Sequence, residues 1–421
     1  MFINLTNIDF CPGSGGGSAN LQEDKSVTYT TNGNYTITPD EGYDGLSSVG
    51  VTVNYDGTDY RNQTGTVDVD GLRAIGWNEA SIGYFNANVL HYPWENDNYK
   101  VTDGNKALYG VVNSSNISNY SNDPNLIYCP YFDMTGVTSM FLKFSSKYLQ
   151  GIPLLDTSSV TDMNYAFYGC YLLKSIPLLN TSSVTRTEYM FSYCKSLQSI
   201  PLLNTSSVTS MDHMFEECRL LRSIPQLDTS SVTNMGSMFY NCEVLQSIPQ
   251  LDTSKVTSMN DMFYGCTSLK TIPQLDTSSV TSMGAMFYNC TGLQSIPELN
   301  TSNVTNTSFM FSGYISDMYI KRIEGLDMSS VTNADSMFRY CSSLSYIRLN
   351  GNLNVGLDIS ATSELDYDSV KSILTAASNT VNTDSKTLYF NSKQTDQNGE
   401  LAALVATCTS KGWTISGLTL N

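Results

Sequence analysis

A column of carboxylate and amide side chains recurs through the middle of the chain and is the first place to look for chemistry. Its members are Asp156, Asn180, Asn204, Asp228, Asp252, Asp276, Asn300 and Asp327. A glycosidase needs two carboxylates at a particular separation, whereas this column accepts Asp and Asn alike. A calcium ion would use the same oxygens, but the Thr-Ser pair that follows nearly every member favours a turn, because an Asx turn needs only an acceptor oxygen. We interpret the column as a set of turn caps.

Other catalytic patterns are missing from the sequence. The two histidines, His91 and His213, lie far apart and neither belongs to a metal-ligand spacing. The segment Gly13 to Gly17 lacks the Lys-Ser/Thr ending of a phosphate loop. We therefore predict that the protein is not an enzyme and uses no metal and no cofactor.

Three rows of side chains are predicted to point outward and could bind a partner. The first row is Lys174, Gln198, Arg222, Gln246, Lys270 and Gln294. The second is Gln226, Gln250, Gln274 and Glu298, and the third is Tyr168, Tyr240, Tyr264 and Tyr288. Tyrosines with amides suit glycans or protein surfaces, through stacking and hydrogen bonds. The alternative is a solvated face that only keeps the protein in solution.

These rows exist because the chain repeats every 24 positions, as the steps from Val160 to Val184 and on to Val208 show. The same valine recurs at Val232, Val256, Val280 and Val304, and phenylalanine, cysteine and proline columns keep the same spacing. A fixed period with apolar positions in phase indicates a solenoid of stacked coils. Six cysteines share one core position, where parallel side chains suit free buried thiols better than disulfides.

Within one coil, residues 251–274, the apolar residues from Val256 to Leu269 are three and four apart, which places them on one face of a helix or of successive helical turns, and we predict a short helix. The next residues, up to Ile272, read as a short strand, and Pro273 closes it because proline cannot donate to a ladder. The predicted coil is therefore strand, turn, short helix and turn.

The pattern Leu-Asp-Thr-Ser-x-Val-Thr-x-Met-x-x-Met-Phe-x-x-Cys-x-x-Leu resembles the BspA-like leucine-rich-repeat surface proteins over residues 132–357. The resemblance implies an α/β solenoid with a parallel β-sheet along one face, and a role in adhesion or surface display. The unit 305–330 departs from the pattern, since Thr307 replaces Met, Tyr314 replaces Cys and extra residues precede Leu326. We expect an irregular coil there.

The flanking segments predict smaller modules. Residues 1–20 read as an arm with a Gly-rich linker, and its apolar residues Phe2, Ile3, Leu5, Ile8 and Phe10 are candidates for an anchor into a virion. Residues 21–56 predict a small β-module with a hairpin at Asn32-Gly33, and this module resembles N-terminal modules of phage tail and fibre proteins. Residues 57–131 are expected to cap the solenoid, and residues 358–421 to form a C-terminal αβαβ cap.

Charge and targeting signals narrow the function. A net charge of −17 argues against nucleic acid or an anionic membrane as partner. The sequence has no apolar run long enough to span a membrane and no recognisable signal peptide. A surface-type repeat without such a signal favours a protein assembled in the host cytoplasm and released by lysis.

The sequence therefore predicts a bacteriophage virion protein, a head or tail fibre or decoration subunit. It would attach to other virion proteins by its N-terminus, form a homo-oligomer and contact a host surface glycan or protein. The alternative is a bacterial cell-surface leucine-rich-repeat adhesin.

Overall fold

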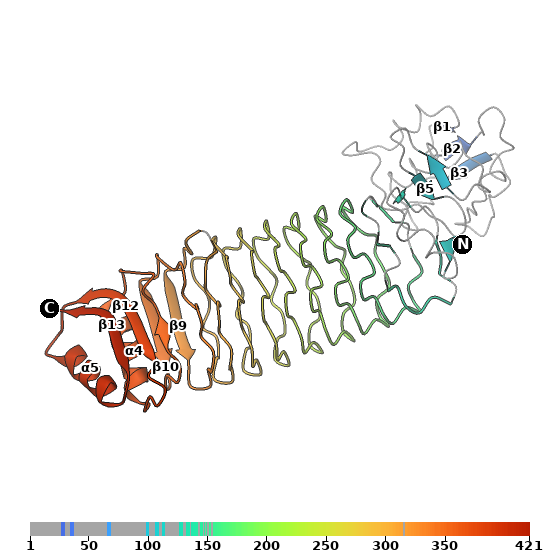
Figure 1. The fold of residues 1–421 in the computed structure, drawn as a ribbon. Coiled ribbons are helices and arrows are strands. Elements are labelled where there is room, and N and C mark those ends of the chain that lie inside the picture. The colour runs from blue at the N-terminus through green and yellow to red at the C-terminus, as the bar shows by residue number, and fades with distance from the viewer. Residues whose placement is uncertain are drawn as a thin grey trace. The chain divides into compact units, whose positions relative to one another are not determined.

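The computed structural model describes residues 134–421, apart from residues 135, 142, 143, 146, 148, 150, 153, 154 and 315, together with eight short strands between residues 27 and 133. The chain divides into two compact units, one of residues 1–183 and 194–203 and one of residues 184–193 and 204–421. Both contain coils of the repeat, which are coloured from green to orange in Figure 1.

The first unit contains short strands ahead of its coils. Strands β1 (Val27–Tyr29), β2 (Asn34–Ile37) and β3 (Gly65–Asp68) form an antiparallel sheet in the order β1-β2-β3. The other strands are β4 (Asn98–Lys100), β5 (Lys106–Leu108), β6 (Val112–Asn113), β7 (Leu126–Tyr128) and β8 (Phe132–Asp133). The pairing of β1 with β2 confirms the predicted hairpin strands.

The sheet β1-β2-β3 joins residues on both sides of residue 56, where the sequence predicts a module boundary. The predicted division into domains stays a prediction. The predicted anchor residues 2–10 lie outside the described residues.

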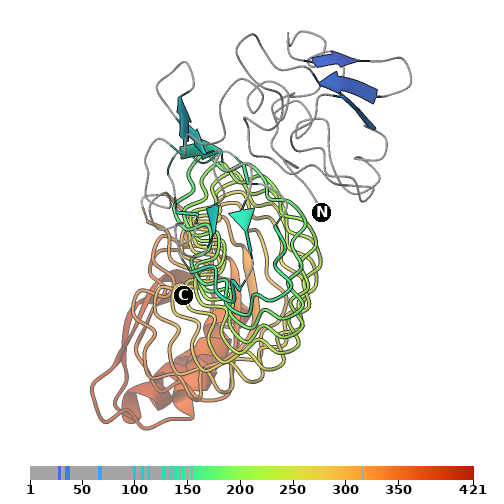
Figure 2. The same ribbon diagram turned by 90° about the vertical axis from the view of Figure 1, so that its right-hand side faces the viewer.

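The coils of the second unit stack side by side, and each is bridged to the equivalent position of the next, as Ser258 is to Ser282. Figure 2 shows them overlying one another. In the coil 251–274 the predicted short helix is wrong. From Met262 to Cys266 alternate backbone N–H groups bond within the coil, as Met262 does to Met259 O and Tyr264 to Asp261 O, with N···O distances of 3.3 and 3.0 Å.

The intervening N–H groups point to the next coil instead. Those of Asp261, Phe263 and Gly265 donate to carbonyls of the following coil, at 2.9, 3.0 and 2.8 Å. Asp261 and Gly265 have φ values of 56° and 70°, in the left-handed region that interrupts an α-helix. The coil therefore forms successive turns and not a helix, and these turns hydrogen-bond to the neighbouring coil.

The predicted strand in every coil is also wrong. Between residues 155 and 321 the described chain forms isolated bridges but no strand. Near the expected position the coils are joined by two backbone bonds, from Ser268 N to Glu243 O at 3.1 Å and from Lys270 N to Gln246 O at 3.4 Å. Pro273 follows three positions later and cannot donate. Beyond residue 321 a parallel strand pair forms between β9 (Arg322–Asp327) and β10 (Tyr346–Asn350).

The core of each coil is a set of apolar columns. The rings of Phe239, Phe263 and Phe287 are stacked with centroids 5.7 and 5.8 Å apart and are fully buried. The thiol of Cys266 donates to Phe239 O, with an S···O distance of 3.1 Å, and every cysteine of the described chain is free and buried. The prediction of buried free thiols is therefore confirmed for these residues.

The predicted irregular coil at 305–330 is confirmed. Its bridge joins Asn306 to Asn333, a longer interval than the regular step from Ser282 to Asn306 before it. The extra residues form a short excursion that bonds to the following coil through Gly313 N to Arg339 O and Met318 N to Tyr340 O, both 2.8 Å.

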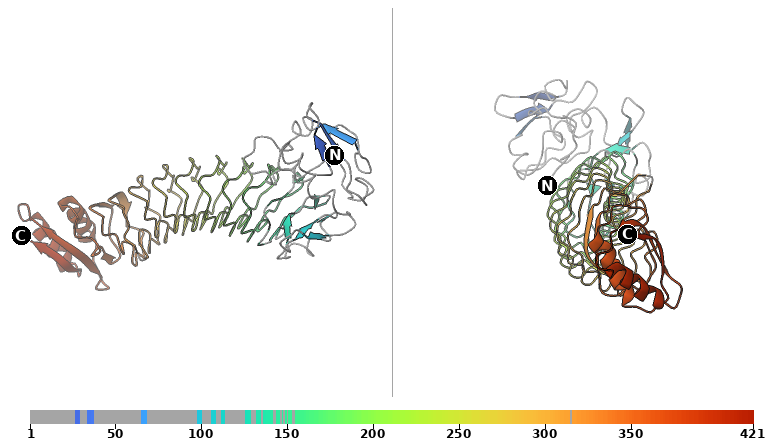
Figure 3. Two further views of the ribbon diagram at one scale, coloured as in Figure 1. Left: turned by 90° about the horizontal axis from the view of Figure 1, so that it is seen from above. Right: turned by 90° about the vertical axis from the view of Figure 1, so that its left-hand side faces the viewer.

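The C-terminal residues form the expected αβαβ arrangement. Strand β11 (Leu357–Asp358) precedes α4 (Tyr367–Ser378), β12 (Thr387–Gln394), α5 (Glu400–Ser410) and β13 (Thr414–Leu420), and the three strands form a parallel sheet in the order β11-β12-β13. Asp366 caps α4 by accepting from Ser369 N at 2.8 Å. Figure 3 shows α5 beside this sheet.

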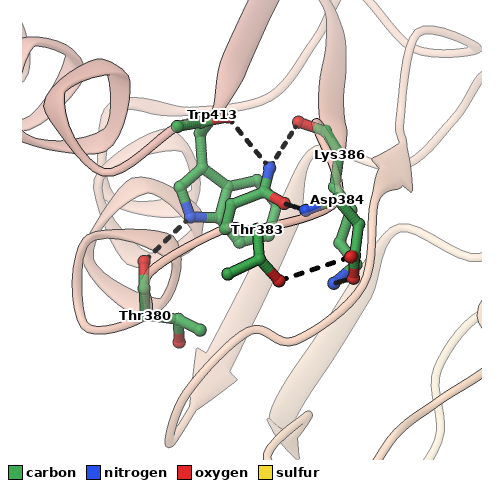
Figure 4. A network of polar contacts seen from close by, with 7 residues as sticks. Thr380, Thr383, Asp384, Lys386 and Trp413 are labelled. Carbon is green, nitrogen blue, oxygen red and sulfur yellow. Dashed lines mark hydrogen bonds and ion pairs between the residues drawn. The ribbon is translucent and has the colours of Figure 1, made fainter.

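A polar clamp holds the loop between α4 and β12 to the start of β13. Trp413 Nε1 donates to Thr380 O at 3.1 Å, and Asn382 Nδ2 donates to Lys386 O and Gly412 O at 2.9 and 3.1 Å. Lys386 also pairs with Asp384 at 2.7 Å (Figure 4). The clamp satisfies backbone groups that would otherwise lack partners in the loop.

Candidate binding groove

An open groove runs along the coils of the second unit, with a volume of about 1340 Å³. The coils from Gln226 to Thr301 each contribute the segment that follows their proline, so that the same positions recur along this part of the groove. The groove begins at the coil of Gln226 and ends at Asn350 beyond the irregular coil. Its regularity comes directly from the repeat, because each wall residue is one member of a column.

Glutamines of the second predicted row lie in this groove and tie the coils together. Gln226 Nε2 donates to Gln250 O, Gln250 Nε2 to Gln274 O and Gln274 Nε2 to Glu298 O, at 2.6, 2.6 and 2.7 Å. Each amide nitrogen also lies 3.2 or 3.3 Å from the carbonyl of the leucine that follows it. These side chains are exposed, but their N–H groups are used between coils and not held ready for a ligand.

The carboxylate column forms Asx turns, as predicted. Asp252 Oδ1 accepts from Ser254 N at 3.1 Å and from Ser254 Oγ at 2.7 Å, and Asn300 makes the same pair of bonds with Ser302. The serine hydroxyl and N–H lower the pKa of Asp252, and Asp228 and Asp276 are shifted downward for the same reason. The column therefore carries charge at neutral pH.

Threonine hydroxyls complete the connections. Thr253, buried below the groove, donates from Oγ1 to Asp276 O at 2.8 Å, and Thr229 and Thr277 repeat this bond to the coil that follows. With the glutamine and serine donors also used, the groove offers mainly oxygen lone pairs to a ligand: glutamine Oε1 and the outer carboxylate oxygen.

The groove is acidic as well as rich in acceptors. Its lining includes the carboxylates Asp228, Asp252, Asp276, Glu298 and Asp327, and no Lys, Arg or His. Sequence reasoning treated the aspartates as turn caps and did not assign them to a binding face. Their position in the repeat could have indicated this face, because each of Asp228, Asp252 and Asp276 lies two residues after a glutamine of the second row.

The predicted tyrosine row is brought together by the fold. Tyr240, Tyr264 and Tyr288 are half-buried and stacked, with centroids 4.3 and 4.5 Å apart. In the first unit Tyr168 lies 5.5 Å from Tyr165 in a tilted pair. Because the inner rings cover one another, the row presents ring edges and hydroxyls more than open ring faces.

The Lys/Gln/Arg row lies elsewhere on the coils. Lys174, Gln198, Arg222, Gln246, Lys270 and Gln294 are all exposed, and none lines the groove. Their backbones join neighbouring coils, as Gln198 N does to Lys174 O at 3.0 Å. This row stays a prediction as a binding face, and the anchor residues lie outside the described chain.

His213 occupies a coil position and stacks on Tyr189 with centroids 4.3 Å apart. Burial lowers the pKa of His213, but its bond to Asp212 at 2.9 Å and the surrounding carboxylates leave the net shift upward. Among the residues that the structure describes, no three His, Cys, Asp or Glu side chains are grouped to hold a metal ion.

The stacked coils, with their buried Leu, Val, Phe and Cys columns, define a solenoid of the leucine-rich-repeat type, which confirms the predicted solenoid but not its predicted helices and parallel β-sheet. The chain belongs to the family described as Mycoplasma protein of unknown function, DUF285. The matches cover residues 135–248 and 239–351, together just over half of the 421 residues.

Solved structures of leucine-rich-repeat proteins are also similar. The T. pallidum leucine rich repeat protein is 20% identical with a TM-score of 0.31, over 47% of this chain and 75% of that chain. An internalin (inlF) from Listeria monocytogenes is 12% identical with a TM-score of 0.23, over 64% and 81%. The functional domain of InlJ from the same species, described as including a cysteine ladder, is 16% identical with a TM-score of 0.21, over 69% and 70%.

A search of curated proteins finds no match. Within the described part of the chain, no helix has the length and apolar character needed to cross a membrane. Neither the family match nor the described residues support the virion role that the sequence predicts.

Proposed function

We propose that this protein is a bacterial cell-surface adhesin of the leucine-rich-repeat type and that its groove binds a basic, donor-rich segment of a partner protein. The observation that carries the proposal is the groove itself, in which glutamine donors are used between coils and serine donors within a coil, while Asp228, Asp252 and Asp276 are exposed. A ligand must then supply the donors, and ammonium or guanidinium groups do so with a favourable charge. Binding and not catalysis is the proposed role.

The charge of the groove gives a sharp test. The triple variant Asp228→Asn, Asp252→Asn and Asp276→Asn should keep the fold, because Asn300 forms the same turn in a neighbouring coil. We expect the full chain to bind a lysine-rich peptide at low salt, to lose most of that binding in the triple variant, and to lose it also at high salt. The matched control is Asp156→Asn, which changes the same turn in the first unit, outside the groove.

Unchanged peptide binding by the triple variant would show that the groove is not the peptide-binding site. The surface location is tested separately, by labelling intact, uninfected cells with antibody against the chain. Detection only in purified phage particles would replace the adhesin with the virion protein that the sequence predicts. Formation of a homo-oligomer stays a prediction, which sedimentation of the full chain would check.

A further inference from the structure

A second pocket, which the repeat does not reproduce, lies in the second unit beside the irregular coil. It has a volume of about 520 Å³, and its lining includes Asp317, Ser336, Arg339, Tyr340, Asp358 and Ser360. The coils elsewhere present the same side chains again and again, whereas this combination occurs once among the described residues. Such a pocket, with a few convergent polar groups, is the usual form of a small-ligand site.

The excursion of the irregular coil builds one wall of the pocket. Gly313 N and Met318 N donate to Arg339 O and Tyr340 O of the following coil, both at 2.8 Å. A side chain at Gly313 would collide with Ser316 O, so the turn requires glycine. The two bonds fix the backbone on either side of Asp317, an exposed carboxylate at the pocket wall.

Another part of the lining comes from the end of β11 and the residues that follow it. Asp358 Oδ1 accepts from Ser360 N at 3.0 Å and from Ser360 Oγ at 2.6 Å, so this carboxylate is held in a fixed turn. Its other oxygen has no hydrogen bond to the described chain. The pocket thus has one carboxylate from β11, Asp358, which is held in a turn, and one from the irregular coil, Asp317.

An aromatic ring and a guanidinium line the same pocket. Tyr340 is 37% exposed, although its neighbours in the core are buried. Arg339 lies with Cζ 5.0 Å from the Tyr340 ring centroid and carries donors that no carboxylate of the described chain engages. The pocket therefore combines an apolar surface, acceptors on two sides and a donor group.

We infer that this pocket binds a neutral pyranose ring. The C–H face of a sugar would rest on Tyr340, neighbouring hydroxyls would donate to Asp317 and Asp358, and Arg339 would donate to a hydroxyl or ring oxygen. An anionic ligand is disfavoured because two carboxylates face one guanidinium. This inference goes beyond the proposed function, since it concerns a different site and a different class of ligand.

The test uses the full chain and four probes, the methyl glycosides of glucose, galactose, mannose and N-acetylglucosamine. We expect saturation transfer from the protein to at least one of them by NMR, followed by a measurable Kd. Tyr340→Asn should weaken that binding about tenfold or more, and Asp317→Ala about tenfold. Tyr340 has a φ of 63°, and Asn241 and Asn289 adopt this backbone at the same position of other coils, so the asparagine variant should fold.

The matched control is Tyr319→Ala, which removes a ring that is 59% exposed at the end of the same excursion but outside the pocket. Unchanged binding in this control, with loss in Tyr340→Asn, supports the site. No transfer to any of the four glycosides, or equal binding by Tyr340→Asn, overturns it. Either result leaves the peptide experiment on the groove unaffected, so that failure of this inference and failure of the proposed function can be distinguished.

Discussion

Two threonines in one coil allow the energy of the connections between coils to be measured. Thr253 Oγ1 donates to Asp276 O at 2.8 Å, and Thr257 Oγ1 donates to Thr233 O at 3.1 Å. Thr253 is 1% exposed, whereas Thr257 is exposed to solvent. Replacement by valine removes each hydroxyl and keeps the shape of the side chain.

The two losses should differ because the two acceptors differ. Thr233 O keeps a second donor, the N–H of Thr257 at 2.8 Å. Asp276 O has no other hydrogen-bond donor in the described chain, and a valine methyl would cover it. Leaving a covered carbonyl without a donor costs about 1–3 kcal/mol, and losing a bond at an exposed, still satisfied carbonyl costs about 0.5–1 kcal/mol.

Hydrogen exchange followed by mass spectrometry is the appropriate assay, because stability in a solenoid is a sum of local terms. We expect Thr253→Val to speed exchange in residues 253–277 about tenfold or more, and Thr257→Val to speed it only a few-fold. Urea unfolding should rank the two variants in the same order. Equal acceleration by both variants, or acceleration spread evenly over distant coils, would refute the reasoning.

Three further outcomes follow from the coils. Asp252→Ala should destabilise the fold by about 0.5–1 kcal/mol, while Asp252→Asn should not. Because the turn lowers the pKa of Asp252 below 3.8, the stabilisation by its carboxylate is present above about pH 4 and is lost as the pH falls through the lowered pKa. Acid titration of both variants checks this. Burial beside Tyr240 raises the pKa of Tyr264 to about 12 from 10.0, so stability should fall as the pH rises from 10.0 to about 12, and less so in Tyr264→Phe when unfolding is measured across that range. All eight described cysteines are buried, and burial raises the pKa of the Cys266 thiol, so these cysteines should react with a disulfide reagent at pH 8 only after unfolding, which a thiol count with and without urea checks.

The sequence allowed the period, the core columns, the Asx turns and the C-terminal elements to be predicted, because each depends on local chemistry. The helix in each coil was wrong for a reason that periodicity cannot show. Spacings of three and four fit a helix, but they also fit successive turns whose remaining N–H groups bond to another coil. Gly265, Asn241 and Asn289 share a column of left-handed residues, and this was the available signal.

The groove was predicted only in part. Gln226, Gln250 and Gln274 were expected to point outward, and they are exposed, yet their N–H groups are used between coils. An exposed amide can donate to a ligand or to a carbonyl of the next coil, and the distance between coils decides which. The sequence of one repeat does not give that distance. The pocket at Tyr340 could not be predicted, because an excursion of unpredictable path places Asp317 beside it.

The bonds of each regular coil reach only the coil before it and the coil after it, which has a genetic consequence. Unequal recombination between neighbouring repeats can add or delete whole coils and leave every remaining contact with an equivalent partner. Such recombination should stop at the irregular coil, because its bridge from Asn306 to Asn333 spans a longer stretch of chain than the regular repeat. Gene variants of different length should therefore vary on its N-terminal side and keep the segment from residue 305 onward intact.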